Sequence, residues 1–442
     1  MNRAAVILAA GAGTRMKSQT PKVLHKVAGL SMLGHVIAGL KAAGVSRIVV
    51  VIAPGADAVR DYAQGLGCQT AVQDKQLGTG HAAAAAAPAL KNFDGELVIA
   101  YGDMPLMTAS TFQASFAARG DGLAIVAFRA ADSGAYGRVL LDASGALDRI
   151  VEFKDAGPAE RRTDLCNAGV LAADAKKFFG WVSRLDNKNA QGEFYLTDVP
   201  ALARREGVRC AVATVAEDDA LGVNSRAELA EAERRMQQRL RAAAMAAGVG
   251  MTAPETVFLS HDTVLEADVE IEPFCVFGPG VKVAAGAHIK SYSHLEGATV
   301  ARGAIIGPYA RLRPGAVIGE GAHIGNFVEI KNAQIDKGAK ANHLTYLGDA
   351  HVGAGANIGA GVITCNYDGF GKYHTEIGAG AFIGSDTALV APVKVGAGAI
   401  TAAGSVITRD VDADAMAVAR GQQVEKPGWA KAFREWKKKE KK

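Results

Sequence analysis

The feature that most constrains the fold is a six-residue repeat of aliphatic positions that begins near Ile271 and continues, with interruptions, almost to Arg409. Small residues fill the places between, as in Ile318-Gly-Glu-Gly-Ala-His. Side chains repeat their direction every 3.6 residues in a helix and every 2 in a strand, so neither element explains the period. It predicts a solenoid built from one short strand and one turn per repeat. The repeat positions are Ile271, Phe277, Val283, Ile289, Leu295, Ile306, Leu312, Ile318, Ile324, Ile330, Ile377, Ile383, Leu389 and Val395.

Three such repeats would close a triangular coil with the aliphatic side chains inside. Stacked strands lie about 4.8 Å apart, so the run from Ile271 to Ile407 predicts a prism of roughly seven or eight coils. The pattern resembles the hexapeptide-repeat left-handed parallel β-helix, a fold that departs from the usual right-handed crossover. A disordered Gly/Ala-rich segment is the alternative, but such segments lack regularly spaced aliphatic residues.

Length and charge set further bounds. A chain of 442 residues is too long for one ordinary core, so two domains are expected. The net charge of +4 arises from interspersed basic and acidic residues and does not favour a nucleic-acid partner. The basic end, Lys437–Lys442, is typical of a solvated tail. No apolar run reaches the roughly 18 residues of a membrane span.

The cysteines indicate the redox compartment. Five cysteines, an odd number without a CxxC pair, favour reduced thiols in a cytoplasmic protein. The same spacing argues against a zinc site or a disulfide framework. The five are Cys68, Cys166, Cys210, Cys275 and Cys365.

A glycine-rich loop follows the first apolar stretch. Residues 4–10 read as a buried parallel strand, and Gly11-Ala-Gly-Thr-Arg-Met16 comes directly after it. Glycines let backbone N–H groups approach phosphates, and Arg15 and Lys22 add positive charge. The third glycine of the dinucleotide fingerprint and the Gly-Lys-Ser/Thr of the P-loop are absent. The loop therefore fits neither of these two phosphate-binding motifs, and Gly-x-Gly alone does not identify a ligand.

The stretch Leu8-Ala-Ala-Gly-Ala-Gly-Thr-Arg-Met with the downstream Pro21-Lys22 resembles the signature of sugar-1-phosphate nucleotidyltransferases. Ala12 stands where many members have a long basic residue. The resemblance implies that Arg15 and Lys22 are catalytic, through charge neutralisation. It also implies nucleotide contacts at Leu8, Ala9, Ala10, Gly11 and Lys22.

Strands and helices alternate through this half of the chain. Residues 46–52 and 96–101 read as strands and residues 82–90 as a helix, which predicts a parallel, doubly wound α/β sheet. Ligands of such sheets bind beyond the carboxyl ends of the strands. Asp103 falls at one of these ends and is a candidate Mg²⁺ ligand, although an isolated Asp there is often a helix cap. Oxygen ligands leave Mg²⁺ and Mn²⁺ both open.

The resemblance assigns the remaining polar motifs of this half. It implies that Gln73, Gly78 and Thr79 read a uracil base, with Tyr101 beside them, and that Asn224 is the second metal ligand. Hydroxyl-rich sugars need amides, carboxylates and backbone groups. By the same resemblance the sugar pocket is formed by Gly137, Glu152 and Asn167.

A helix is expected after the first domain. Ser225 and Glu228 form a capping box that opens a run rich in helix formers up to about Gly248. No heptad seam supports a coiled coil. We therefore expect a nucleotidyltransferase domain at 1–224, a linker helix at 225–248, and a left-handed β-helix domain with a basic tail at 249–442.

The hexad rhythm breaks twice, at residues 331–351 and 364–376, and both breaks carry polar residues. Loops on a rigid scaffold are where function is often placed. Together with the first half, these breaks resemble the bifunctional enzymes that make UDP-N-acetylglucosamine, a cell-wall and lipopolysaccharide precursor. In that family glucosamine 1-phosphate is acetylated from acetyl-CoA, and the product reacts with UTP.

The resemblance implies a role for each polar residue of the second half. His343 is the general base, because an imidazole can take a proton at neutral pH. The sugar phosphate is bound by Arg313, Lys331, Tyr346 and Asn357. Acetyl-CoA is bound by Ala360, Asn366, Tyr367, Ser385, Ala403 and Arg420. The family also implies a homotrimer with acetyl-transfer sites shared between neighbours.

Two alternatives remain open from the sequence. The chain can be a monofunctional nucleotidyltransferase whose β-helix only assembles subunits, or a binding protein with degenerate sites. An assay for thiol released from acetyl-CoA distinguishes the first alternative. Inactivity in both transfer assays would favour the second.

Overall fold

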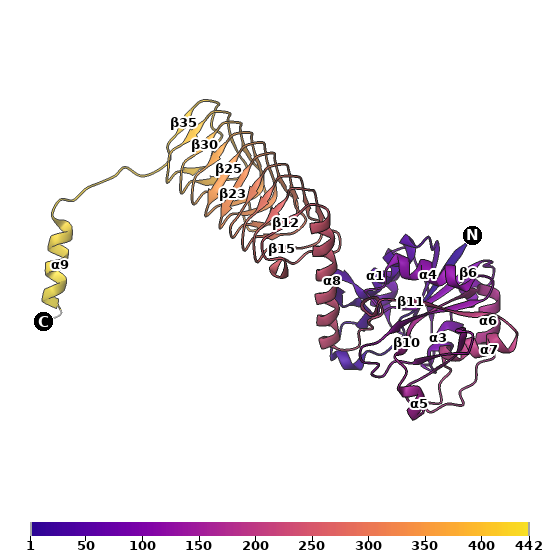
Figure 1. The fold of residues 1–442 in the computed structure, drawn as a ribbon. Coiled ribbons are helices and arrows are strands. Elements are labelled where there is room, and N and C mark those ends of the chain that lie inside the picture. The colour runs from indigo at the N-terminus through magenta and orange to yellow at the C-terminus, as the bar shows by residue number, and fades with distance from the viewer. Residues whose placement is uncertain (1, 441–442) are drawn as a thin grey trace. The chain divides into compact units, whose positions relative to one another are not determined.

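The computed structural model describes residues 2–440, and the chain divides into two compact units between Leu240 and Arg241 (Figure 1). No described helix is long and apolar enough to span a bilayer.

The first unit is built on a nine-stranded sheet with the main order β11-β7-β10-β6-β1-β4-β5. Its central strands are Val/Ile/Ala-rich and almost fully buried, as expected for a sheet covered on both faces. Its strands are β1 Arg3–Leu8, β4 Arg47–Ile52, β5 Gln69–Val72, β6 Glu96–Tyr101, β7 Leu123–Arg129, β8 Arg138–Leu141, β9 Leu147–Val151, β10 Leu165–Asp174 and β11 Cys210–Val215, with a separate hairpin of β2 Lys26–Val27 and β3 Leu30–Ser31.

Helices cover both faces of this sheet, which confirms the doubly wound α/β prediction (Figure 1). One core includes Phe112 and other residues of α1, α2 and α4, and the opposite core includes Trp181 and other residues of α3, α6 and α7. The helices are α1 Met32–Ala42, α2 Asp57–Gly65, α3 Thr79–Ala84, α4 Ala109–Arg119, α5 Pro158–Arg161, α6 Ala175–Val182 and α7 Val199–Arg205.

Two details of this unit differ from the sequence prediction. β10 is antiparallel to both β6 and β7, because the β8–β9 hairpin precedes it in place of a crossover helix. The helix expected at residues 82–90 begins earlier, at Thr79, and ends at Ala84. A short 3₁₀ turn, η3 Pro88–Leu90, follows it, because proline cannot donate the hydrogen bond that continues a helix.

The second unit is a three-faced prism of short parallel strands. One face runs β12-β14-β17-β20-β23-β25-β27-β30-β33-β35, from β12 Gly250–Met251 to β35 Met416–Ala417. The long strands β24 Glu329–Ile335 and β26 Tyr346–Val352 each turn a corner and join the other two faces. The remaining strands of the first face are β14 Glu270–Ile271, β17 His288–Ile289, β20 Ile305–Ile306, β23 His323–Asn326, β25 Lys340–His343, β27 Asn357–Ile358, β30 Phe382–Ile383 and β33 Ile400–Thr401.

The hexad residues point into the prism, and this confirms the β-helix prediction. All fourteen repeat positions are buried, each at most 2% exposed. Ile271 pairs with Ile289, a coil of 18 residues, whereas Ile358 pairs with Ile383, 25 residues further along. The longer coil contains the loop at 364–376. The rigid core therefore fixes where this loop leaves the scaffold.

The helix that follows the first sheet is α8, Arg226–Ala246. Ser225 Oγ accepts a hydrogen bond from the Glu228 backbone N–H at 3.2 Å, and the Glu228 carboxylate accepts from the N–H of Asn224 at 2.6 Å. The Glu228 side chain therefore caps the backbone N–H of Asn224, one residue before Ser225, whose N–H a standard capping box would use. It also holds Asn224 at the helix entrance.

The described part of the basic tail forms helix α9, Trp429–Glu440. Every residue from Arg420 to Glu440 is exposed, in line with a solvated segment. Lys441 and Lys442, the end of the predicted tail, lie outside the described residues.

Candidate functional site

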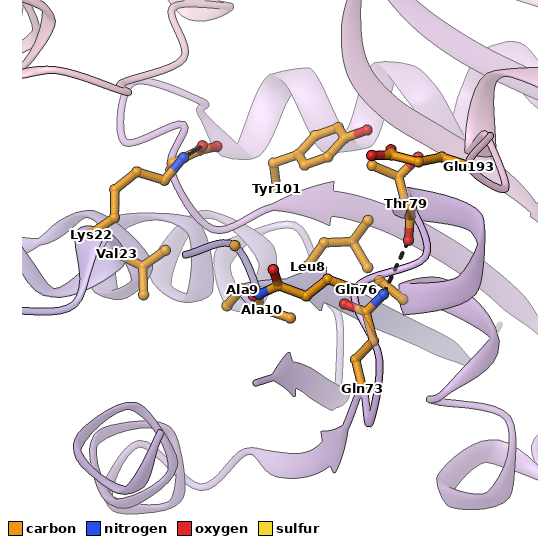
Figure 2. A pocket seen from close by; sticks show the side chains of 14 residues that line it. Leu8, Ala9, Ala10, Lys22, Val23, Gln73, Gln76, Thr79, Tyr101 and Glu193 are labelled. Carbon is orange, nitrogen blue, oxygen red and sulfur yellow. Dashed lines mark hydrogen bonds and ion pairs between the residues drawn. The ribbon is translucent and has the colours of Figure 1, made fainter. Parts of the chain in front are cut away.

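A cavity of about 300 Å³ opens at the carboxyl ends of β1 and β6, where the α/β sheet was expected to hold its ligand. Figure 2 shows Lys22 at one end of it and Thr79 and Glu193 at the other, with Leu8, Ala9 and Ala10 between. The lining includes ten residues proposed from sequence: Leu8, Ala9, Ala10, Gly11, Lys22, Gln73, Gly78, Thr79, Tyr101 and Asp103.

Lys22 connects the two candidate metal ligands. Its Nζ donates a hydrogen bond to the Asp103 carboxylate and another to Asn224 Oδ1 at 3.0 Å. The Lys22 and Asp103 side chains are 13% and 18% exposed, so the pair is largely withdrawn from water. One carboxylate oxygen and one amide oxygen thus converge on a single point. Hard oxygens of this kind fit a Mg²⁺ ion whose other ligands are phosphate and water.

No described cluster offers three or more His, Cys, Asp or Glu side chains to a metal. A divalent ion bound at Asp103 and Asn224 would therefore depend on substrate oxygens to complete its coordination.

Gln73 and its neighbours form the far end of the cavity. The buried Gln73 amide donates to Gly78 O at 3.1 Å and contacts His81 Nδ1 at 3.2 Å. Gly78 has φ +108°, and a Cβ there would lie 2.6 Å from the Phe194 carbonyl oxygen. Only glycine fits that position, so the chain there packs directly against the backbone of Phe194.

Two polar residues of the cavity lining, Gln76 and Glu193, were given no role of their own from the sequence. Gln76 Nε2 donates to the carbonyl of Ala10 at 2.7 Å and so holds the loop after β1. Gln76 lies in the same motif as Gly78, and its spacing from the glycine-rich loop gave no signal. Glu193 comes from a distant loop that reaches the cavity only through the fold.

The expected sugar-binding residues lie beside this cavity. Asn167 N–H donates to Gly137 O at 2.9 Å, and a Cβ on Gly137 would lie 3.6 Å from the Glu152 carboxylate. Thr197 Oγ1 donates to Glu152 Oε1 at 3.0 Å. A small adjoining cavity is lined by Tyr101, Asn167 and Thr197, so Tyr101 borders both spaces.

Burial sets the ionisation of two groups here. It raises the pKa of the Tyr101 phenol, and the Glu152 carboxylate raises it further, so Tyr101 stays protonated and able to donate. Burial also raises the pKa of Glu152, with contributions from Asp155, Asp198 and Glu193, although the Thr197 hydrogen bond opposes the shift.

Arg15 is the one predicted residue of the glycine-rich loop that the structure leaves outside. It lies on the 3₁₀ turn η1, Thr14–Met16, is exposed, and does not line the cavity. Left-handed backbone at Gly13 and Lys17 brackets the turn. Among the residues that line the cavity, Lys22 alone carries a positive charge.

Three cations gather on the second unit where the hexad rhythm breaks. Lys372 lies against Lys331 and lowers the pKa of Lys331, and Arg313 lowers it further. Arg313 Nη1 also donates to Glu329 Oε1 at 2.8 Å. Like charges held this close favour an anionic ligand such as phosphate. Lys372 was not assigned from the sequence, because only the fold shows that the 364–376 loop returns to β24.

Asp349 holds the polar residues next to these cations. Its two carboxylate oxygens accept from Asn332 Nδ2 at 2.6 Å and from Asn366 Nδ2 at 2.5 Å. Burial opposes the ionisation of Asp349, but these two hydrogen bonds and the charges of Lys372 and Lys331 lower its pKa.

Tyr346 and Asn366 lie side by side over Gly348. A Cβ on Gly348 would lie 2.3 Å from Tyr346 Oη and 2.8 Å from Asn366 Nδ2. The structure therefore brings one predicted sugar-phosphate residue next to one predicted acetyl-CoA residue.

His343 lies at the end of β25, on the face adjacent to Lys331 of β24. The His343 ring is exposed, and its Nδ1 lies 2.7 Å from Asn326 Oδ1. Asn357 is on the same face as His343, on β27. Within one chain, the expected acetyl-transfer residues thus occupy two faces of the prism. Asn326 was not assigned from the sequence.

The other expected acetyl-CoA residues form a column through successive coils. Asp386 N–H donates to Ala360 O at 2.7 Å, and Gly404 N–H donates to Ser385 O at 2.8 Å. Arg420 Nη1 donates to Ala403 O at 2.7 Å, so Ala360, Ser385, Ala403 and Arg420 follow one line. Tyr367 is exposed on the neighbouring loop, where its hydroxyl donates to Gly369 O at 2.7 Å.

Comparison with known families and proteins agrees with this architecture. Residues 5–170 match the MobA-like NTP transferase domain, and residues 297–332 and 374–409 match the bacterial transferase hexapeptide repeat. The chain is 57% identical over 435 residues to the bifunctional protein GlmU of Rhodospirillum rubrum, covering 98% of this chain and 97% of that one.

Two further relatives agree over nearly their whole length. The bifunctional protein GlmU of Azorhizobium caulinodans is 55% identical over 97% of this chain and 96% of the relative. That of Paramagnetospirillum magneticum is 51% identical over 98% of this chain and 96% of the relative.

The fold and the two groups of polar residues define a nucleotidyltransferase joined to a hexapeptide-repeat transferase. The chain belongs to the GlmU family. It is a bifunctional enzyme of UDP-N-acetylglucosamine synthesis, with acetyltransferase and uridylyltransferase activities.

Proposed function

We propose that the two reactions run at two separate sites, uridylyl transfer in the cavity of the first unit and acetyl transfer on the prism. The observation that carries the first assignment is the convergence of Lys22, Asp103 and Asn224 at one end of a cavity that has an amide and an exposed backbone at the other. We assign the base of the nucleotide to Gln73 and its phosphates to Lys22, within the cavity of about 300 Å³.

In the uridylyl site the chain acts by binding and charge neutralisation. The phosphate oxygen of N-acetylglucosamine 1-phosphate attacks the α-phosphorus of UTP, and pyrophosphate leaves, so no protein nucleophile is needed. We assign Lys22 to the phosphates, with Arg15 joining it when the loop closes on them. Mg²⁺ held by Asp103 and Asn224 would supply further neutralisation of phosphate charge.

The remaining polar groups of this site select the substrates. Gln73, Gly78 and Thr79 offer an amide and backbone groups to the edge of the uracil. Gly137, Glu152 and Asn167 are assigned to the sugar, where a carboxylate and an amide can bind hydroxyl groups. Protonated Tyr101, at the boundary of the two spaces, can donate to either substrate.

In the acetyl site the amine of glucosamine 1-phosphate attacks the thioester carbonyl of acetyl-CoA. The C–N bond forms, the C–S bond breaks, and CoA leaves as the thiol. We assign His343 to take the proton from the amine, and Arg313, Lys331 and Lys372 to the sugar phosphate. Tyr346 and Asn357 are assigned to the same substrate. The column of Ala360, Ser385, Ala403 and Arg420, with Asn366 and Tyr367, is assigned to acetyl-CoA.

We assign the active form to a homotrimer in which neighbouring prisms complete each acetyl site. Support comes from the position of His343 and Lys331 on different faces of one chain. It also comes from four aromatic residues, each about half exposed, that stack along one corner of the prism. An exposed apolar column of this length is typical of an interaction surface. It consists of Phe274, Tyr292, Tyr309 and Phe327.

Light scattering after size-exclusion chromatography tests the trimer. A mass of three chains is expected at micromolar concentration, and a fully active monomer would contradict the shared site.

A coupled assay tests the reaction order. Glucosamine 1-phosphate should yield UDP-N-acetylglucosamine only when acetyl-CoA and UTP are both present, and thiol should appear without UTP. A protein that uses N-acetylglucosamine 1-phosphate and UTP but never releases thiol would be monofunctional.

A further inference from the structure

Asn326 is the residue beside His343 in the preceding coil of the prism. β23 and β25 pair in parallel with Asn326 opposite His343, and the Leu344 N–H donates to Asn326 O at 3.1 Å. The two side chains meet with His343 Nδ1 2.7 Å from Asn326 Oδ1. The ladder thus fixes both backbones, and their side-chain contact is short and direct.

The nature of this contact decides which ring nitrogen is basic. A neutral imidazole carries one N–H, and an amide oxygen accepts hydrogen bonds without donating. Nδ1 of His343 therefore holds the proton, and Nε2 keeps its lone pair. Nε2 has no hydrogen-bond partner among residues 2–440, and the ring is exposed. If the NH₂ group of Asn326 faced the ring instead, Nδ1 would have to accept a hydrogen bond. The neutral ring would then carry its hydrogen on Nε2, which could not take a proton from the substrate.

We propose that Asn326 is a positioning residue for acetyl transfer, whose Oδ1 holds His343 in the Nδ1–H tautomer with Nε2 directed to the substrate amine. The inference rests on the proposed role of His343 as the base and assigns that role to one nitrogen.

The charged groups near the ring do not replace this contact. His323 lies on β23, the strand that carries Asn326. Burial lowers the pKa of His323, and the charges of Lys290, Lys340 and His343 lower it further. The two lysines have no acceptor atom, and the hydrogen bond described for His343 Nδ1 goes to Asn326 Oδ1 and not to the His323 ring. Among the described contacts of His343, the amide of Asn326 is the one that orients the ring.

Four variants of the full chain test the proposal: Asn326→Ala, Asn326→Asp, His343→Ala, and the amide control Gln334→Ala. Gln334 lies on β24 and bonds to Asp336, away from the ring. Steady-state kinetics of acetyl transfer give kcat, both KM values and the pH profile. Uridylyl transfer and the unfolding temperature report on the integrity of each protein.

Asn326→Ala should lower kcat for acetyl transfer about 10-fold, since the tautomer is no longer held, while both KM values stay within about 2-fold. Asn326→Asp keeps the acceptor and should recover most of kcat. Its carboxylate also favours the imidazolium, so the acid limb of the pH profile should move to higher pH. Gln334→Ala should behave as the unmodified protein.

Three results would overturn the proposal: an unchanged kcat in Asn326→Ala, a loss confined to KM, or Asn326→Asp as slow as Asn326→Ala in a folded protein. If Asn326→Ala also loses uridylyl transfer or melts early, Asn326→Asp alone decides. His343→Ala distinguishes the proposed role of His343 as the base from the proposed role of Asn326 in positioning it. Acetyl transfer that persists in His343→Ala removes the proposed base itself, whereas an inactive His343→Ala beside a normal Asn326→Ala removes only the positioning role.

Discussion

Lys22 Nζ donates a hydrogen bond to Asn224 Oδ1 at 3.0 Å, joining the start of the nucleotidyltransferase fold to the entrance of helix α8. The same Nζ bonds to Asp103 after β6. Residues from three distant parts of the chain thus meet at one end of the cavity. The positive charge of Lys22 thus lies between a carboxylate oxygen and an amide oxygen, at the end of the cavity that we assign to phosphate.

Replacing Lys22 should therefore impair one reaction only. Lys22→Ala removes a positive charge from the phosphate end, and loss of such a group typically costs about 100-fold in kcat. We expect that loss in uridylyl transfer, with acetyl transfer unchanged. Lys17→Ala, an exposed lysine of the same loop, is the matched control. Equal losses in Lys17→Ala and Lys22→Ala would show a general charge effect in place of a site.

Glu152→Gln should stabilise the first unit near neutral pH while weakening sugar binding. Burial raises the pKa of Glu152 in the folded state, so its ionised form is disfavoured there at neutral pH. As the pH falls below neutrality the folded protein takes up this proton before the unfolded chain does, and the carboxyl stops opposing folding. The gain from Gln should shrink accordingly as the pH falls.

Thermal unfolding of Glu152→Gln at pH 7.5 and pH 5 measures this effect. Glu160→Gln serves as a control of opposite sign, because hydrogen bonds from the Gly157 N–H and Arg149 lower the pKa of Glu160. That variant should be destabilised at neutral pH. A lower unfolding temperature for Glu152→Gln at pH 7.5 would contradict the conclusion that the buried, ionised Glu152 carboxylate opposes folding.

His351 should make the β-helix more stable at mildly acidic pH. Its two ring nitrogens contact Asp336 at 2.8 Å and Glu376 at 2.7 Å. Burial acts to lower the pKa of His351, but these two carboxylates raise it above the usual value. The imidazolium thus stabilises the fold fully below about pH 6.5, the unfolded value, and the effect is lost as the pH rises through the folded value.

His351→Gln should cost about 1 kcal/mol at pH 6 and less at pH 8, because the ion pairs are partly exposed. Denaturation of the second unit at both pH values measures the difference. The control is His294→Gln, at an exposed histidine of the same prism. A destabilisation that does not depend on pH would show that packing, and not the charged pair, is responsible.

Gly348→Ala should damage acetyl transfer more than folding. The added methyl would lie 2.3 Å from Tyr346 Oη and 2.8 Å from Asn366 Nδ2, so both side chains must move. We expect at least about a 10-fold loss of acetyl-transfer kcat/KM, since displacements of about 1 Å cost that much or more. Gly355→Ala, where a Cβ meets nothing within 4 Å but the backbone φ of +69° strains any side chain, controls for destabilisation of the same prism and should leave acetyl transfer unchanged. Normal acetyl transfer in Gly348→Ala would exclude Tyr346 and Asn366 from the site.

Periodicity made the β-helix predictable from the sequence. A buried position such as Ile318 repeats at a fixed interval, and each repeat carries its own small residues for the turn. Strand β10 was harder, because its antiparallel pairing with β7 and β6 joins residues that are far apart in the sequence. The end of α3 shows the same limit, since Ala85–Ala87 favour a helix locally but lead into Pro88.

The residues of the two sites could likewise be predicted only where the local sequence carries a signal. Gln73, Gly78, Thr79 and Asp103 lie in continuous motifs at strand ends, and the structure brings them to one cavity. Lys372 and Asn326 carry no local signal: each meets its partner, Lys331 or His343, only through the register of stacked coils. Arg15 shows the converse, because it belongs to the motif but is exposed and does not line the cavity.

We propose that two scaffolds in one chain hold two independent sites, and a pair of variants tests this separation. Asp103→Ala and His343→Ala are assayed for both reactions, with the unfolding temperature of each protein checked. We expect Asp103→Ala to lose uridylyl transfer and keep acetyl transfer, and His343→Ala to do the opposite. Loss of both activities in either folded variant, or retention of both, would contradict it.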